Sequence, residues 1–167
     1  MLPKFVIAGG GGWTPQAAQA LQRFAENWQL PVGCGFRFQD TFDNRHALYA
    51  GDVGIGINPK LAARIREADL VIALGVRLGE MTTQGYTLLT APRAAQKLVH
   101  IHASAEELNR VYQADLAIHA SMRAAARSAS CSSLSASTTR TGSPSPSSEN
   151  SVLGNSLGLG PITLLAA

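Results

Sequence analysis

Two short apolar segments that run into glycine carry the residues best suited to bind a ligand. The first, residues 5–8, leads into four consecutive glycines at 9–12, and the second, residues 68–74, leads into Gly75. Where a parallel strand ends, glycines let backbone N–H groups and a helix N-terminus face a phosphate. Arg77 follows two residues after Gly75 and is a charged donor suited to phosphate. The two segments together indicate a nucleotide-type pocket.

These residues also have plain structural explanations. The glycines at 9–12 could simply let a strand turn tightly into its helix, although four in a row exceed what a turn requires. Arg77 could form a surface ion pair with Glu80. Cys34 and Cys131 are too few and too scattered for a disulfide framework or a zinc site, so we expect Cys34 to be a buried structural thiol.

The elements that position these residues alternate between strand and helix patterns over the first 120 residues or so. Thr14 is a natural N-cap and Pro15 suits the first position of a helix. The patterns predict strands at 5–8, 30–34, 70–74, 98–101 and 116–118, and helices at 15–28, 59–67 and 92–96. A capping box at 104–107 predicts a further helix that runs to about residue 112. Residues 36–56 and 79–90 are expected to be loops. The fold class predicted is α/β, an open parallel sheet with helices on both faces.

The composition excludes several classes of function. The chain has 167 residues, 46% of them hydrophobic, and a net charge of only +3. No basic stripe with interleaved aromatic residues is present, so we expect no nucleic-acid partner. No apolar run approaches the ~18 residues of a membrane helix, and the N-terminus does not resemble a signal peptide. The expected location is therefore the cytoplasm, without a membrane partner.

The composition changes after Ser121. Serine makes up 12 of the 46 residues from 122 to 167, and this stretch has no Asp, Lys, His or aromatic residue. We therefore predict one domain over 3–121 and a low-complexity tail over 122–167, either a natural linker or the product of a shifted reading frame. The tail is not expected to form a second core, although the apolar residues 157–165 could pack on the domain or on a second copy.

A set of short motifs occurs in a fixed order over residues 3–121: 8–11 (AGGG), 30–32 (LPV), 51–54 (GDVG), 67–71 (EADLV), 75–78 (GVRL), 99–102 (VHIH) and 106–108 (EEL). Each motif alone is degenerate, but their order and spacing are specific. The chain resembles the middle domain of thiamine-diphosphate-dependent enzymes of the acetolactate synthase type.

The resemblance implies a six-stranded Rossmann-like sheet between two domains that bind thiamine diphosphate and Mg²⁺ in the parent enzyme, which acts on 2-oxo acids. The glutamate that activates thiamine and the Gly-Asp-Gly metal motif are not in this sequence. We therefore assign no catalytic and no metal-binding residue and expect the isolated chain to be inactive. Its expected partners are the family's thiamine-binding domains or a second copy of itself.

Some relatives carry a nucleotide in this domain: FAD in acetolactate synthases and ADP in oxalyl-CoA decarboxylases. By resemblance, the cofactor-binding residues are Gly9, Gly10, Gly11, Gly51, Gly54, Gly75, Arg77 and His102. His100 and His102 stand where nucleotide-binding relatives have aspartates, and a neutral imidazole does not replace a carboxylate that accepts from a ribose diol. We therefore expect weak binding of ADP and weaker or no binding of FAD.

The two histidines also permit a metal site, although no third ligand lies nearby in the sequence.

The alternatives to the enzyme-domain interpretation are a stand-alone module that binds FAD, NAD or ADP, and a structural domain without a ligand.

Overall fold

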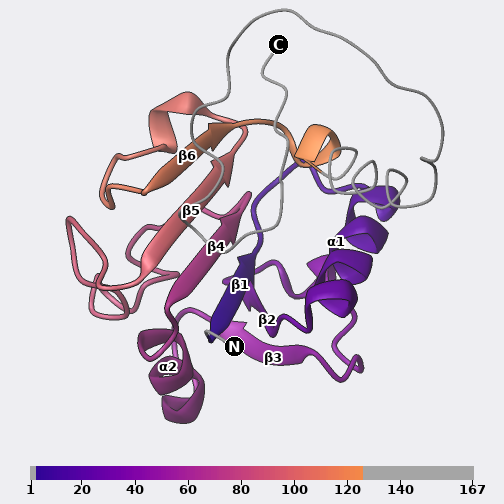
Figure 1. The fold of residues 1–167 in the computed structure, drawn as a ribbon, viewed down its shortest axis with the longest axis horizontal. Coiled ribbons are helices and arrows are strands. Elements are labelled where there is room, and N and C mark those ends of the chain that lie inside the picture. Colours follow the sequence, from indigo (N-terminus) through magenta and orange to yellow (C-terminus); the bar gives the residue numbers. More distant parts are fainter. Residues whose placement is uncertain (1–2, 126–167) are drawn as a thin grey trace, which may run out of the picture.

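A computed structural model describes residues 3–125 and shows a single six-stranded sheet in which all neighbouring strands are parallel (Figure 1). The strands are β1 (Lys4–Ala8), β2 (Val32–Gly35), β3 (Tyr49–Val53), β4 (Leu70–Leu74), β5 (Lys97–His102) and β6 (Leu116–His119). Their spatial order is β3-β2-β1-β4-β5-β6. The predicted fold class is confirmed. The expectations for residues 126–167 lie outside the described part of the chain.

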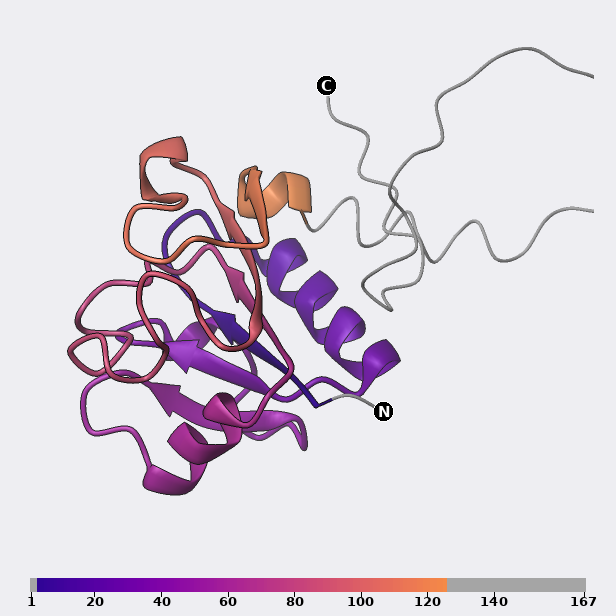
Figure 2. The same cartoon turned by 60° about the vertical axis from the view of Figure 1, so that its left-hand side comes forward.

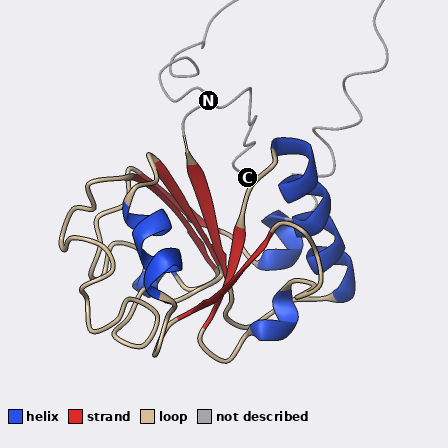
Figure 3. Ribbon diagram, turned by 90° about the horizontal axis from the view of Figure 1, so that it is seen from below, coloured by secondary structure: helices blue, strands red, loops and turns tan. Residues whose placement is uncertain are grey.

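Two α-helices cover opposite faces of this sheet, as Figures 2 and 3 show. Helix α1 (Pro15–Trp28) begins as predicted, because the Thr14 hydroxyl oxygen accepts the N–H of Ala17 at 3.2 Å. Helix α2 (Pro59–Arg66) is capped by Asn58, whose side chain accepts the N–H of Lys60 at 2.9 Å. Within residues 3–125, no helix combines the length and apolar character that crossing a membrane requires.

The core consists of two apolar layers, one on each side of the sheet. Alternate residues of β1 divide between them: Val6 packs in the layer under α1, and Ile7 packs in the layer under α2. Residues 5–8 are fully buried on both faces, as expected for a central strand of a parallel sheet. The unbroken apolar runs of β1 and β4 therefore fix the centre of the sheet.

Three local expectations were wrong. The predicted loop at 36–56 contains a short 3₁₀ turn at Gln39–Thr41 and the edge strand β3, and residues 92–96 are not helical. The expected capping box also does not form, because the Ser104 side chain makes no capping hydrogen bond and only a 3₁₀ turn over Ala105–Glu107 follows. Each error concerns a segment whose conformation depends on distant partners rather than on its own pattern.

The strand order reverses direction between β1 and β4. In open α/β sheets, ligands bind at such a switch point, beyond the carboxyl ends of the strands. The first glycine segment follows β1 and the second follows β4. The topology therefore brings the two glycine segments of the sequence to one edge of the sheet.

Candidate functional site

The ends of β1, β4 and β5 are joined by hydrogen bonds beyond the strands themselves. The Gly9 N–H donates to the Leu74 carbonyl at 3.1 Å, and the Gly75 N–H donates to the Ile101 carbonyl at 2.8 Å. A side chain on Gly75 would come within 2.6 Å of the Gly9 carbonyl oxygen. Glycine is therefore needed at this junction for close approach of two backbones.

The glycine loop 9–12 presents backbone donors next to the N-terminus of α1. Among the described residues, the N–H groups of Gly10, Gly11 and Gly12 have no hydrogen-bond partner. A Cβ atom on Gly11 or Gly12 would meet no atom within 4 Å. The Trp13 indole N–H donates to the Gly9 carbonyl at 2.8 Å, and α1 starts two residues later. Free N–H groups and a helix N-terminus together favour an anion here.

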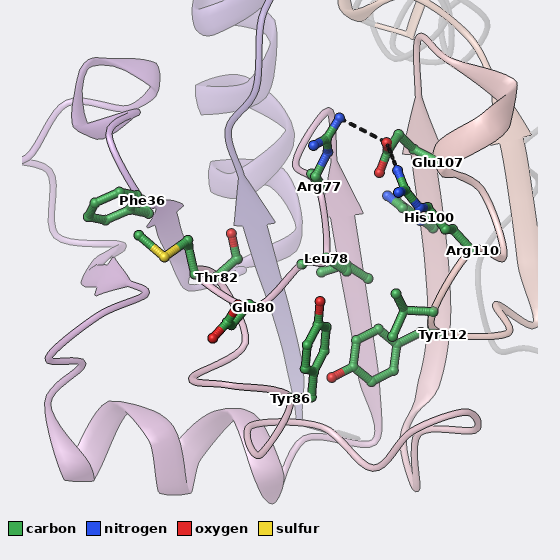
Figure 4. Close-up of a pocket in the computed structure, with 13 residues that line it drawn as sticks. Phe36, Arg77, Leu78, Glu80, Thr82, Tyr86, His100, Glu107, Arg110 and Tyr112 are labelled. Atoms are coloured by element: carbon green, nitrogen blue, oxygen red, sulfur yellow. Dashed lines mark hydrogen bonds and ion pairs between the residues drawn. The ribbon is translucent and has the colours of Figure 1, made fainter.

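Arg77 extends from the end of β4 and is already paired with a carboxylate. Its Nη2 lies 2.9 Å from Glu107 Oε1, and the same oxygen accepts Arg110 Nη1 at 2.8 Å (Figure 4). The Glu107 side chain is 8% exposed, whereas that of Arg77 is 68% exposed. The partner of Arg77 is thus Glu107 and not Glu80, the partner considered from the sequence.

The two histidines of β5 lie on one side of the strand, with ring centroids 5.8 Å apart. His100 is buried, and its Nε2 donates to the Val76 carbonyl at 3.0 Å. Burial lowers the pKa of His100 and favours a neutral ring. His102 Nδ1 lies 3.0 Å from the Ser104 backbone nitrogen, at the carboxyl end of β5. Among residues 3–125, no three His, Cys, Asp or Glu side chains are grouped to hold a metal ion.

Gly51 and Gly54 occupy different surroundings from the glycine loop. Gly51 lies inside β3, opposite Gly33, where an added Cβ would come within 3.2 Å of Leu61 in α2. The φ of 122° at Gly51, a conformation that residues with a side chain rarely adopt, accounts for this glycine together with the packing of Leu61. Gly54 follows β3, and its added Cβ would lie 3.0 Å from the Phe36 Cβ atom. The structure thus gathers Gly9, Gly10 and Gly75 at one junction and places Gly51 elsewhere.

A cavity of about 320 Å³ lies beside the Arg77–Glu107–Arg110 cluster. Phe36, Tyr86 and Tyr112 are among its lining residues, and Figure 4 shows Tyr86 and Tyr112 together below Leu78. Reasoning from the sequence missed Glu107, Arg110 and both tyrosines as pocket residues. The only local signal was the three-residue spacing of Glu107 and Arg110, which is typical of an ion pair.

Residues 4–128 match the family described as "Thiamine pyrophosphate enzyme, central domain". The chain is 32% identical to a sulfoacetaldehyde acetyltransferase of Alcaligenes xylosoxydans xylosoxydans over 122 residues, which are 72% of this chain and 20% of that protein. It is also 32% identical over 113 residues to an acetolactate synthase large subunit of Parasynechococcus marenigrum, which covers 68% of this chain and 18% of that protein.

A further relative is a 3D-(3,5/4)-trihydroxycyclohexane-1,2-dione hydrolase of Clostridium perfringens, 35% identical over 89 residues, or 52% of this chain and 14% of that protein. The chain thus spans about a fifth or less of the length of these relatives. The family match covers the whole sheet, from the first residue of β1 to beyond β6. The chain belongs to the thiamine pyrophosphate enzyme family, in which it corresponds to the central domain.

Proposed function

We propose that this chain serves as the central domain of a thiamine-diphosphate-dependent enzyme that acts on 2-oxo acids, and that it has no catalytic activity alone. The observation that carries the proposal is the match of residues 4–128 to the central domain, in a chain that spans about a fifth of its relatives. We assign no described residue to thiamine diphosphate or Mg²⁺, which the proposal places in the other domains of the parent enzyme.

The activity proposal is tested with the purified 167-residue chain, thiamine diphosphate and Mg²⁺. We expect no decarboxylation and no carboligation of pyruvate, measured as released CO₂ and as acetolactate. The thiamine-binding domains of the family, or a second copy of this chain, are the proposed partners. Turnover by the isolated chain would overturn the proposal. The proposed location is the cytoplasm.

We further propose that a nucleoside diphosphate binds weakly over Gly9, Gly10 and Gly11, with Arg77 as the charged donor. The unpaired N–H groups of Gly10, Gly11 and Gly12 and the N-terminus of α1 support this position. Because His102 supplies no carboxylate to accept a hydrogen bond from a ribose, we expect ADP to bind weakly and FAD to bind more weakly still. In this proposal Gly54, Gly75 and His102 would lie along the path of the ligand, whereas Gly51 is explained by its φ of 122° and the packing of Leu61.

Gly11 provides a sharp test of nucleotide binding because its Cβ position is open and its φ angle is not in the left-handed region. Gly11→Asp should abolish ADP binding by placing a negative charge on the loop, and Gly11→Ala should retain it. Arg77→Ala should weaken ADP binding about tenfold through loss of a charge-assisted hydrogen bond. Calorimetric titration of ADP and FAD measures these effects. Tight FAD binding unchanged by Arg77→Ala would contradict the assignment.

A structural domain without a ligand is the second candidate, and the ion pair between Arg77 and Glu107 favours it. Because the Arg77 guanidinium is already paired with the Glu107 carboxylate, its positive charge is partly balanced without any phosphate. Failure of the wild-type chain to bind ADP at millimolar concentration would favour this candidate over the nucleotide site.

A further inference from the structure

The cavity beside Glu107 has the size and lining of a small-molecule site. Its volume of about 320 Å³ lies at the lower end of the range for ligand pockets. The lining combines apolar and aromatic side chains with a few charged groups, a mixture typical of such pockets. It lies beyond the carboxyl end of β4 and is formed mainly by the segments 77–86 and 107–112.

The cluster of Arg77, Glu107 and Arg110 on one side of the cavity carries a net positive charge. Arg77 and Arg110 both bind Oε1 of Glu107, so two guanidinium groups share one carboxylate. Each arginine gives one nitrogen to Glu107, and its other N–H donors have no partner among residues 3–125. Figure 4 shows the Glu80 carboxylate, the other acidic group of the lining, pointing away from this cluster.

The opposite part of the cavity is suited to an apolar ring. Tyr86 and Tyr112 lie next to each other in Figure 4, with Phe36 at the far end of the lining. Tyr86 is 44% exposed, a high value for a large aromatic side chain that lines a cavity. Aromatic side chains favour a planar ring in offset or edge-to-face contact.

We propose that this cavity binds a small organic anion that carries an aromatic ring and a single phosphate group. Arg77 and Arg110, held together by Glu107, receive the phosphate, and Tyr86 contacts the ring beside the buried Tyr112. The site goes beyond the nucleotide proposal, because Arg110 and both tyrosines lie outside the glycine loop.

Phenyl phosphate is the probe for this site, because it contains the ring and the anionic group and little else. Binding to the full chain is measured by NMR titration, with inorganic phosphate and phenol as the two halves of the ligand. We expect phenyl phosphate to bind at least about tenfold more tightly than either half, since both contacts contribute. The resonances of Tyr86, Val111 and Tyr112 should shift most.

Two variants separate the two contacts. Arg110→Gln should weaken phenyl phosphate binding about tenfold through loss of one charged donor. Tyr86→Asn should weaken phenyl phosphate binding but leave that of inorganic phosphate unchanged; asparagine tolerates the positive φ of 63° at this residue. Arg45→Gln is the matched control, because Arg45 is also an exposed arginine paired with an acidic residue, Asp43, but does not line this cavity.

The Gly11→Asp variant distinguishes this proposal from the nucleotide proposal. Phenyl phosphate should still bind to that variant, whereas ADP should not. The proposal is overturned if phenyl phosphate fails to bind at millimolar concentration, if Arg110→Gln binds it as tightly as the wild type, or if phosphate alone binds equally well. If the wild-type chain binds phenyl phosphate but not ADP, this site is supported and the nucleotide site is refuted.

Discussion

Gly10 and Gly75 approach so closely that a side chain on Gly10 would overlap the carbonyl oxygen of Gly75. Gly10 also has a φ of 78°, a conformation that costs other residues about 1–2 kcal/mol. This contact joins the loop after β1 to the loop after β4. The glycine run of the sequence is therefore required by the fold at one position, whatever ligand the loop binds.

Gly10→Ala and Gly11→Ala should differ sharply in stability. We expect Gly10→Ala to lower the free energy of unfolding by at least about 2 kcal/mol, from positive φ and steric overlap together. Gly11→Ala should change it by less than about 1 kcal/mol and can increase it, because the site is open and alanine restricts the unfolded chain. Urea unfolding measures both. Equal stabilities of the two variants would refute the close approach.

Met122 lies one residue beyond the predicted domain boundary, yet it is only 2% exposed and contacts Gly75. Met122→Ala should therefore lower the free energy of unfolding by about 2–3 kcal/mol through lost burial and a cavity. Met81→Ala is the control, because Met81 is 44% exposed and should lose less than about 0.5 kcal/mol. A negligible effect of Met122→Ala would mean that the domain ends before this residue.

Asp115 should make the free energy of unfolding depend on pH in the acidic range. Its pKa is lowered, first by the hydrogen bond from the Leu98 N–H at 2.9 Å and further by Lys97. Because the folded pKa lies below the unfolded value of about 3.9, the charged form stabilises the fold above that value. The contribution is lost as the pH falls through the folded pKa.

Asp115→Asn should accordingly cost about 1 kcal/mol at neutral pH and progressively less as the pH falls through the folded pKa. Lys97→Met is the control, since it removes only an exposed ion pair worth less than about 0.5 kcal/mol. Chemical unfolding at several pH values measures both. A difference between wild type and Asp115→Asn that stayed constant with pH would exclude this carboxylate as the source.

Cys34 should be unreactive in the folded protein. It is fully buried, and burial raises the pKa of its thiol to about 11, so almost no reactive thiolate exists at pH 8. In a Cys131→Ser background, a thiol reagent such as Ellman's reagent should modify Cys34 only after unfolding in urea. Rapid modification of the native protein would show that this part of the core opens readily.

The sequence alone was sufficient where structure depends on near neighbours. Thr14 and Pro15 predicted the start of α1 because capping is decided within one turn of helix. The apolar runs at 5–8 and 70–74 predicted the central strands because such strands are buried on both faces. The order of the short motifs likewise indicated the family, to which residues 4–128 belong.

Only the tertiary structure decided the features that depend on distant partners. Strand β3 has an irregular, glycine-containing sequence and is held by pairing with β2 and by Leu61 of α2. Glu107 binds Arg77 across thirty positions of sequence, which no local pattern predicts. A parallel sheet pairs strands that are remote in sequence. The order of the strands in the sheet, and not the local sequence, therefore determines which residues meet at its carboxyl edge.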